Sequence, residues 1–366
     1  MKIALLANTA GQLYFTKNII RRLKDQGHGI KLLVRDYGDT LTVANEIGME
    51  YFLYSKASGS KIGKIISLPG DILKAYEHLR EFKPDILVGF GVYDAFVSFM
   101  LNRPCVYFED SEPRVNTLSY AIQVKASALL VDTIITPEYF SDELGKKQIR
   151  VKSFKEMAYL HPDYFKPDEN IFNLLGLHNK EDFIILRFNA FDAVHDFSIK
   201  GFSDEDKIRL VKELEKYASV FISSEAGIPD ELNRYVVKIP KSRIHDAIYY
   251  AKLLVTDTQT MATEGAILGT PTIRCNTFVG DNDMGNFIEF EQRYNLIFNY
   301  NDPDKAIIKA VELIQKQNLK EEWKIKKERL LKDKIDINTF MIWLLENYPE
   351  SFEEIKANPD IQNKFK

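Results

Sequence analysis

The sequence predicts an α/β protein of two domains, each built on a parallel sheet of the Rossmann type. Its length is the first reason, because 366 residues exceed the size at which one hydrophobic core usually divides into two. The second is that short, nearly continuous apolar runs alternate with segments of helical spacing, as in parallel strands joined by crossover helices. The third is that this alternation occurs twice, before and after a crossing at 154–170 that contains Pro162 and Pro167.

The two series of strands define the expected domains. In the first series we expect strands at 3–7, 30–34, 49–53, 86–88, 105–108 and 133–136. In the second we expect strands at 183–187, 220–223, 253–256 and 272–274, followed by a largely helical, charged region. We therefore predict an N-terminal domain at 1–165, a C-terminal domain at 166–335 and a helical tail at 336–366.

Composition excludes several classes of protein. A hydrophobic content of 45% is typical of globular chains, and a formal net charge of -4 shows no basic excess, so we expect no nucleic-acid partner. The two cysteines, Cys105 and Cys275, lie far apart in apolar runs, which argues against disulfides and favours a reducing, cytoplasmic location. No apolar run approaches the roughly 18–20 residues of a membrane span, so any membrane contact is expected to be peripheral.

No cofactor or metal is expected. The loop at 8–12 lacks the Gly-x-Gly-x-x-Gly fingerprint of dinucleotide-binding proteins. No spacing of His, Cys, Asp and Glu resembles a metal site. Residues 281–283 have the letters of an Asp-x-Asp motif, but they follow a strand late in the second series, and we interpret them as a surface loop.

The segment 253–274 is the most informative of the chain, since it combines a strand, a hydroxyl-rich turn, a short helix and a Gly-Thr-Pro turn. Such a turn directs free N–H groups and the positive end of the helix dipole beyond the carboxyl edge of the sheet, where phosphate oxygens bind well. Glu264, about one turn into the helix, is placed to accept hydrogen bonds from ribose hydroxyls. The alternative is an ordinary turn in which a threonine caps the helix and Glu264 complements its dipole. The residues expected at the helix start are Thr258, Gln259, Thr260 and Met261.

A second polar stretch, 187–196, follows the first strand of the second series, so Arg187 and Asn189 are expected at the same carboxyl edge. His195 and Asp196 are a candidate proton-handling pair, in which the carboxylate sets the tautomer of the imidazole. A loop that packs against its neighbours, or a capped turn, is the alternative.

An acidic stretch follows the strand at 105–108, with Glu109, Asp110 and Glu112 within four residues. Carboxylates this close are costly unless they are solvated, paired with cations or functional. We take Asp110 and Glu112 as candidate acid–base groups, and a surface acidic turn is the alternative. Because like charges lie so close together, we expect one pKa in the group to be raised.

Four motifs in order resemble those of one family: FKEMAYLHP at 154–162, RFNAFDAVHD at 187–196, IHDAIYYA at 244–251 and MATEGAILGTP at 261–271. This family is the prokaryotic "domain of unknown function 354", regarded as glycosyltransferase-like. The resemblance covers nearly the whole chain. It implies a GT-B-like architecture, in which a cleft of nucleotide-sugar size lies between two Rossmann-type domains, and it brings no established reaction.

The turn at 256–271 is also similar to the donor-binding region of GT-B glycosyltransferases and non-hydrolysing UDP-N-acetylglucosamine 2-epimerases. There, a Thr-Asp-Ser-Gly-Gly turn precedes a helix that carries a ribose-binding Glu, which Glu264 matches. Gln259 and Thr260 replace the two glycines, so side chains stand where these proteins have none. The resemblance further implies that Arg187 meets the phosphates.

These resemblances imply a metal-independent glycosyltransferase that uses a nucleotide-diphosphate sugar, with UDP-sugar as the favoured donor and surface polysaccharide or glycoconjugate synthesis as a context. The acceptor would be deprotonated by Asp110 or Glu112. One alternative is a UDP-sugar 2-epimerase, in which Asp110, Glu112 and His195 transfer protons. Another is a non-catalytic protein that binds nucleotide sugars. The acceptor and the oligomeric state are left open.

Overall fold

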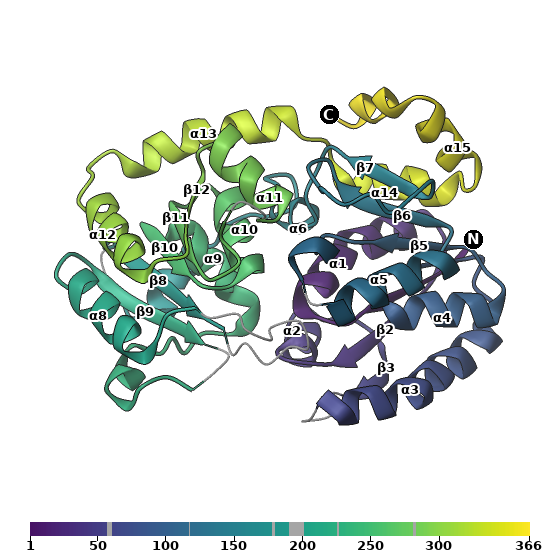
Figure 1. Cartoon of the computed structure of the whole chain (residues 1–366), viewed down its shortest axis with the longest axis horizontal. Coiled ribbons are helices and arrows are strands. Elements are labelled where there is room, and N and C mark those ends of the chain that lie inside the picture. Colours follow the sequence, from purple (N-terminus) through teal and green to yellow (C-terminus); the bar gives the residue numbers. More distant parts are fainter. Residues whose placement is uncertain (57–60, 117, 178–179, 190–200, 225–226, 281–282) are drawn as a thin grey trace. The chain divides into compact units, whose positions relative to one another are not determined.

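The computed structural model of the chain divides into two compact units, Met1–Tyr159 with Asp333–Lys366, and Leu160–Lys332. It describes residues 1–56, 61–116, 118–177, 180–189, 201–224, 227–280 and 283–366, without the side chains of 61–65 and 114 (Figure 1). We predict a separate helical tail at 336–366, whereas in the structure the chain re-enters the first unit at Asp333.

The first unit is built on a seven-stranded parallel sheet with the strand order β3-β2-β1-β4-β5-β6-β7. Its first strand pairs with both β2 and β4, so the strand order reverses between β1 and β4. In parallel α/β sheets this reversal opens a crevice at the carboxyl ends of the two strands. The strands are β1 (Lys2–Ala7), β2 (Gly29–Asp36), β3 (Phe52–Lys56), β4 (Ile86–Gly89), β5 (Cys105–Phe108), β6 (Thr133–Pro137) and β7 (Gln148–Val151).

Helices cover both faces of this sheet, as the buried, apolar strands require. Those on one face contact one another, α1 with α2 and α14, and those on the other face pack in the order α3, α4, α5. The helices are α1 (Ala10–Asp25), α2 (Thr40–Glu46), α3 (Lys61–Phe82), α4 (Val92–Leu101), η1 (Pro113–Val115), α5 (Leu118–Leu130), α6 (Met157–Leu160), α14 (Ile337–Glu346), α15 (Glu350–Ala357) and η5 (Pro359–Phe365).

Hydrogen bonds to one peptide carbonyl join the C-terminal segment to the rest of the first unit. Asn18 of α1 and Asn338 of α14 both donate their side-chain N–H groups to the carbonyl oxygen of Ala158, each at 2.8 Å. Arg22 lies 3.6 Å from Asp336, directly before α14. The two ends of the chain therefore complete one unit together.

The second unit is built on a five-stranded parallel sheet with the order β12-β11-β10-β8-β9. Because β8 pairs with both β9 and β10, the strand order of this sheet reverses between β8 and β10. The strands are β8 (Phe183–Phe188), β9 (Ser219–Ser224), β10 (Leu253–Thr256), β11 (Thr272–Cys275) and β12 (Ile297–Tyr300).

The helices of the second unit follow the same logic, with α9 packed on α10 and α12 packed on α8. The α8 helix begins with a capping box between Ser203 and Asp206, and α12 begins with a side-chain cap from Asp302. The helices are α7 (Asn170–Leu174), α8 (Asp204–Leu214), η2 (Asp230–Tyr235), η3 (Lys241–Arg243), α9 (Ile244–Tyr250), α10 (Gln259–Leu268), α11 (Gly285–Ile288), the π-turn η4 (Glu289–Arg293), α12 (Pro303–Ile314) and α13 (Leu319–Asp333).

In the described part of the chain, no helix is both long enough and apolar enough to cross a bilayer. Together, the two parallel sheets and the helical C-terminus confirm the predicted α/β class with two Rossmann-type parts.

Candidate functional site

Two of the predicted polar segments meet where the strand order of the second sheet reverses. Arg187 lies near the end of β8, and Asp257 directly follows β10. The backbone N–H of Asn189 donates to Oδ1 of Asp257 at 2.8 Å. Arg187, which is buried, donates from Nη1 to the hydroxyl of Ser223 on β9 at 2.7 Å. The guanidinium is thus held at the carboxyl edge of the sheet.

The start of α10 lies at the same edge. Thr258 is its N-cap residue but makes no side-chain cap hydrogen bond, because its hydroxyl pairs with that of Thr256 at 2.8 Å. The first N–H groups of a helix have no acceptor within the helix. An N-cap side chain usually supplies this acceptor, but the Thr258 hydroxyl is bonded to that of Thr256. The N–H groups at the start of α10 can therefore bind an anion. Thr258 is therefore the N-cap residue, as the alternative of an ordinary turn expects, but its side chain does not cap the helix.

The remaining predicted residues of this turn differ in exposure. Met261 is buried, Gln259 is half-buried and Thr260 is exposed. Neither the Gln259 nor the Thr260 side chain makes a hydrogen bond to another described residue. Gly265 lets the helix approach the sheet, since a Cβ there would lie 2.4 Å from Oγ1 of Thr272. The second half of α10 is therefore packed closely on β11 and β10.

Glu264 forms a buried pair with His245, which the sequence analysis did not anticipate. Oε1 of the glutamate lies 3.0 Å from Nε2 of the histidine, and both side chains are almost fully buried. The contact arises because α9 and α10 pack side by side. The ring of Phe165 lies nearly perpendicular to the imidazole, with 6.4 Å between ring centroids. The imidazole therefore orients the carboxyl group that the sequence assigns to the ribose.

Asp257 is the functional candidate that sequence reasoning missed. It is buried, and within the described residues its Oδ2 atom has no hydrogen-bond partner. Burial raises the pKa of this carboxyl to about 7, against the Asn189 N–H and the charges of Lys207 and Arg187, which favour the ionised form. A perturbed carboxyl at a strand-order reversal is a typical candidate site residue. Its place directly after a predicted strand was the available signal.

In the first unit, the acidic stretch after β5 is largely buried. Glu109 accepts hydrogen bonds from the hydroxyls of Tyr107 and Tyr120 and from the N–H of Ser111. Burial raises the pKa of Glu109 to about 7, outweighing these hydrogen bonds. The expectation that one carboxyl of this stretch has a raised pKa is thus confirmed. The carboxyl is that of Glu109, which was not named as a candidate acid–base group. Glu112 is also buried, so the alternative of a surface acidic turn is wrong for both glutamates.

Asp110 differs from its neighbours because it is paired with a cation. Its Oδ2 atom accepts a hydrogen bond from the buried ammonium of Lys155, which also lies 3.5 Å from Oε1 of Glu156. Burial lowers the pKa of Lys155, but the carboxylates of Asp110 and Glu156 outweigh it and raise the value above its usual range. Asp110, Lys155 and Glu156 therefore form a three-membered cluster of charged side chains.

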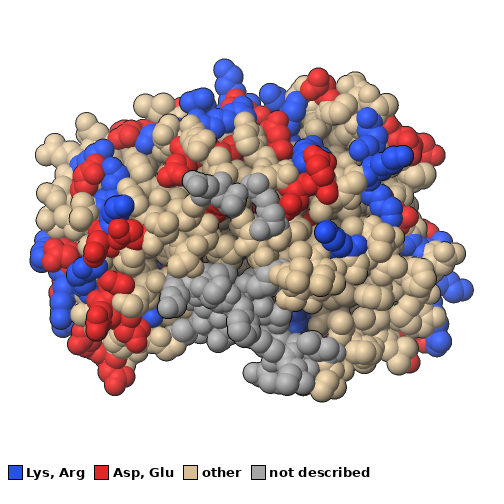
Figure 2. Space-filling view, in the orientation of Figure 1, with Lys and Arg blue, Asp and Glu red and all other residues tan. Residues whose placement is uncertain are grey.

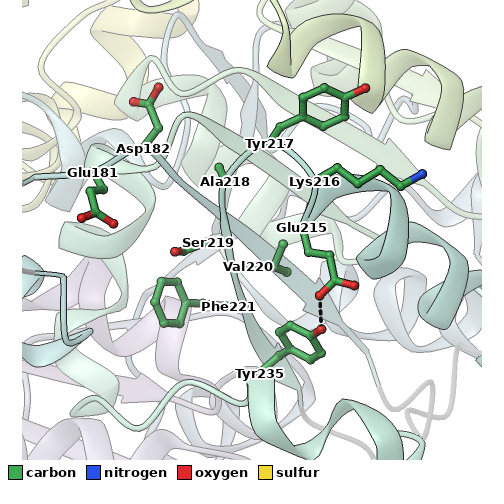
Figure 3. A pocket seen from close by; sticks show the side chains of 10 residues that line it. All are labelled: Glu181, Asp182, Glu215, Lys216, Tyr217, Ala218, Ser219, Val220, Phe221 and Tyr235. Atoms are coloured by element: carbon green, nitrogen blue, oxygen red, sulfur yellow. Dashed lines mark hydrogen bonds between the residues drawn. The ribbon is translucent and has the colours of Figure 1, made fainter.

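A hollow of about 640 Å³ in the second unit lies away from the carboxyl edge of the second sheet. Figure 3 shows its lining, which includes Asp182 just before β8 and Ser219 at the start of β9. Glu215 and Tyr235 are joined there by a hydrogen bond. Since these residues mark the amino edge of the sheet, the hollow does not belong to the candidate site.

A family model matches residues 1–355 of the chain. The chain belongs to this family, described as "Protein of unknown function (DUF354)". No curated protein matches the sequence of this DUF354 chain.

Solved structures show that the DUF354 chain has the GT-B fold. Staphylococcus aureus MnaA with UDP superposes with a TM-score of 0.67 at 11% identity, over 97% of each chain. The UDP-GlcNAc 2-epimerase of Methanocaldococcus jannaschii gives 0.62 at 18% identity, over 91% of this chain and 99% of that one. The glycosyltransferase SsfS6 of Streptomyces sp. SF2575 with thymidine diphosphate gives 0.56 at 12%, over 93% and 99%.

Two further predictions concern His195 with Asp196, and the loop at 281–283. His195 and Asp196 lie outside the described residues of the DUF354 chain. Asp283, which the sequence analysis assigned to a surface loop, is instead buried and pairs with Arg274 at 2.8 Å, so that interpretation is wrong. The described residues contain no group of three or more His, Cys, Asp or Glu side chains arranged to hold a metal ion.

The raised pKa of Asp257 predicts a pH dependence of stability. A carboxyl whose folded pKa exceeds its unfolded value stabilises the fold at low pH, and this contribution is lost as pH rises through the folded value, here about 7. Between pH 5.5 and 8 we expect Asp257 to remove about 2 kcal/mol from the free energy of unfolding. Urea unfolding should therefore show a shallower pH slope for Asp257→Asn than for wild type. An equal slope in Asp257→Asn, with exposed Asp304→Asn as control, would contradict this assignment.

Proposed function

We propose that this chain binds a nucleotide-diphosphate sugar at the carboxyl edge of its second sheet and transfers the sugar to an acceptor without a metal ion. The observation that carries the proposal is the convergence of three elements at that edge. These are the buried guanidinium of Arg187, the α10 start without a side-chain cap, and the Glu264–His245 pair. UDP is the favoured nucleotide, and the similar MnaA structure contains UDP.

The chemistry at this edge suits a diphosphate leaving group. The first N–H groups of α10 and the Arg187 guanidinium would stabilise the negative charge that develops on the diphosphate when the sugar departs. Glu264 would accept hydrogen bonds from the ribose hydroxyls, with its carboxyl group oriented by His245. Because the pKa of Asp257 is raised to about 7, this group can hold a proton near a phosphate and avoid charge repulsion.

The acid–base role is proposed for the acidic stretch of the first unit. Asp110 and Glu112 are the candidates from the sequence, and His195 is the third. Glu109 joins them, because its pKa of about 7 allows it to give or accept a proton near neutral pH. A surface polysaccharide or another glycoconjugate is the proposed acceptor class.

Calorimetry with UDP tests the proposed donor site. We expect wild type to bind UDP, and Arg187→Ala and Glu264→Ala each to weaken binding by about ten- to a hundredfold, since each removes a charge-assisted hydrogen bond to the ligand. Arg209→Ala on α8 is the matched control, because Arg209 is exposed and pairs with aspartates on the surface. Thermal unfolding of each variant separates lost binding from lost folding. If no nucleotide binds wild type at millimolar concentration, the nucleotide-sugar assignment is wrong.

A UDP-sugar 2-epimerase is the second candidate, because a UDP-GlcNAc 2-epimerase is among the similar structures. Incubation with UDP-N-acetylglucosamine in deuterated water distinguishes the two reactions. Deuterium at C2 of the sugar indicates epimerisation, whereas transfer to an added acceptor without such exchange indicates a glycosyltransferase. Binding without either reaction would indicate a non-catalytic nucleotide-sugar-binding protein.

A further inference from the structure

Two neighbouring helices of the first unit, α4 and α5, present large apolar side chains to solvent. We call this surface the α4–α5 face, and Figure 2 shows the area over these helices as largely uncharged. The two helices pack directly on one another. Contiguous exposed apolar patches on a soluble fold mark sites of interaction rather than chance exposure. The members of the face, each at least 37% exposed, are Phe96, Phe99, Met100, Leu118, Ile122 and Leu129.

Cations outnumber carboxylates among the exposed charges of the α4–α5 face. In α4 the single carboxylate is Asp94, which is buried, and α5 contains no acidic residue. The exposed charges are those of Lys125 in α5, Arg103 just after α4 and Asp132 just after α5, and the carboxylate of Asp132 accepts the backbone N–H of Cys105. The whole chain, in contrast, has a net charge of -4. An apolar face with a cationic margin is complementary to an apolar phase bounded by anionic groups.

Backbone carbonyls at the ends of α4 and α5 accept hydrogen bonds within the protein, which suits contact with a medium that offers few hydrogen bonds. At the end of α5, the ammonium of Lys147 donates to the carbonyl oxygens of Ala128, Leu129 and Val131, at 3.2, 3.1 and 2.6 Å. At the end of α4, backbone N–H groups from Asn102 and Arg103 bond to carbonyls of the last turn, each at 3.1 Å. Satisfied backbone carbonyls lower the cost of contact with hydrocarbon.

We propose that the α4–α5 face docks on an anionic lipid surface, with both helices in the plane of the interface. A second copy of the chain fits less well, because symmetric pairing would bring the same two cations of each copy to one contact. The apolar side chains would enter the boundary between headgroups and acyl chains, and Lys125 and Arg103 would contact the headgroups. This inference does not depend on the proposed sugar transfer.

Flotation of the full chain with lipid vesicles tests the proposal. Wild type should float with phosphatidylcholine vesicles that contain phosphatidylglycerol, and the double variant Phe99→Ser with Leu129→Ser should partition at least about tenfold less. These two side chains are 66% and 80% exposed, so their replacement leaves the core intact. The matched control is Ile308→Ser with Ile325→Ser, since both isoleucines are 69% exposed on helices of the second unit. The control variant should float like wild type.

A second pair of substitutions tests the role of charge. Lys125→Gln with Arg103→Gln should reduce binding to phosphatidylglycerol-containing vesicles by about tenfold or more and remove the preference over pure phosphatidylcholine. The proposal is overturned if wild type stays with the unbound fraction, or if both serine double variants float equally well. It is also overturned if the face mediates self-association instead. Sedimentation would then show a concentration-dependent dimer that Phe99→Ser with Leu129→Ser abolishes, without vesicle binding by wild type.

Discussion

Replacing Asp283 by alanine is expected to lower the free energy of unfolding of the second unit by about 3–5 kcal/mol. The reason is that Asp283 neutralises Arg274, a fully buried side chain on β11 that lies 2.8 Å away. The guanidinium also stacks on the ring of Phe287, with 3.6 Å to its centroid, and donates to Asn299 at 3.2 Å. Neither contact supplies a negative charge, and Glu291 acts on Arg274 without a direct hydrogen bond, so the substitution removes the carboxylate that is bonded to this buried cation. Urea unfolding measures the loss.

The control is an ion pair of the same type at the surface. Asp304 pairs with Arg209, but both side chains are exposed, so Asp304→Ala should change stability by no more than about 1 kcal/mol. Removing both buried charges, in Arg274→Met with Asp283→Leu, should restore most of the loss. Equal effects of Asp283→Ala and Asp304→Ala would show that Arg274 is solvated or compensated elsewhere.

Replacing Gly89 by alanine is expected to lower the stability of the first unit by about 3 kcal/mol. A Cβ at this position would lie 2.0 Å from Cγ of Asp94 and 2.3 Å from its Cβ. Asp94 cannot move aside, because it is buried and its Oδ1 atom accepts the N–H groups of Phe90 and Gly91 at 3.2 and 2.9 Å. The end of β4 and the start of α4 would have to separate. Thermal and urea unfolding both report this change.

Gly91 provides the matched comparison two residues away. A Cβ there would meet only Nδ2 of Asn8, at 3.7 Å, which is an ordinary contact. Its φ of -174° is extended backbone that any residue adopts. We therefore expect Gly91→Ala to change stability by less than about 1 kcal/mol. If both alanine variants unfold at the same denaturant concentration, the close approach of Gly89 to Asp94 is not what positions α4.

The central strands could be predicted from the sequence because burial on both faces makes them continuous apolar runs. The expected strands at 105–108 and 253–256 match β5 and β10 without a shift. The edge strands β7 and β12 were missed, since an edge strand has one neighbour and tolerates polar residues such as Gln148 and Asn299. The strand expected at 49–53 occurs later, at Phe52–Lys56. The residues of the expected strand that precede Phe52 are polar or follow a turn that contains glycine.

The candidate site was predictable to the extent that it depends on strand ends. Arg187 and the turn after β10 meet because the carboxyl ends of adjacent parallel strands lie together, which follows from strand order alone. The pairs Glu264–His245 and Asp110–Lys155 depend on how helices and loops far apart in sequence pack, and no local pattern encodes that. For the same reason, the sequence indicated that one acidic group would have a raised pKa, but the structure was needed to assign it to Glu109.

The carbonyl of Ala158, shared by Asn18 and Asn338, has a consequence for the order of biosynthesis. Because Asp333–Lys366 belongs to the unit that begins at Met1, a ribosome finishes the whole second unit before it supplies the last helices of the first. Until then the nascent first unit lacks α14, whose Phe340, Met341 and Leu344 are buried in the complete chain. Synthesis of the segment that follows the second unit, rather than synthesis of the first half, therefore completes the first unit.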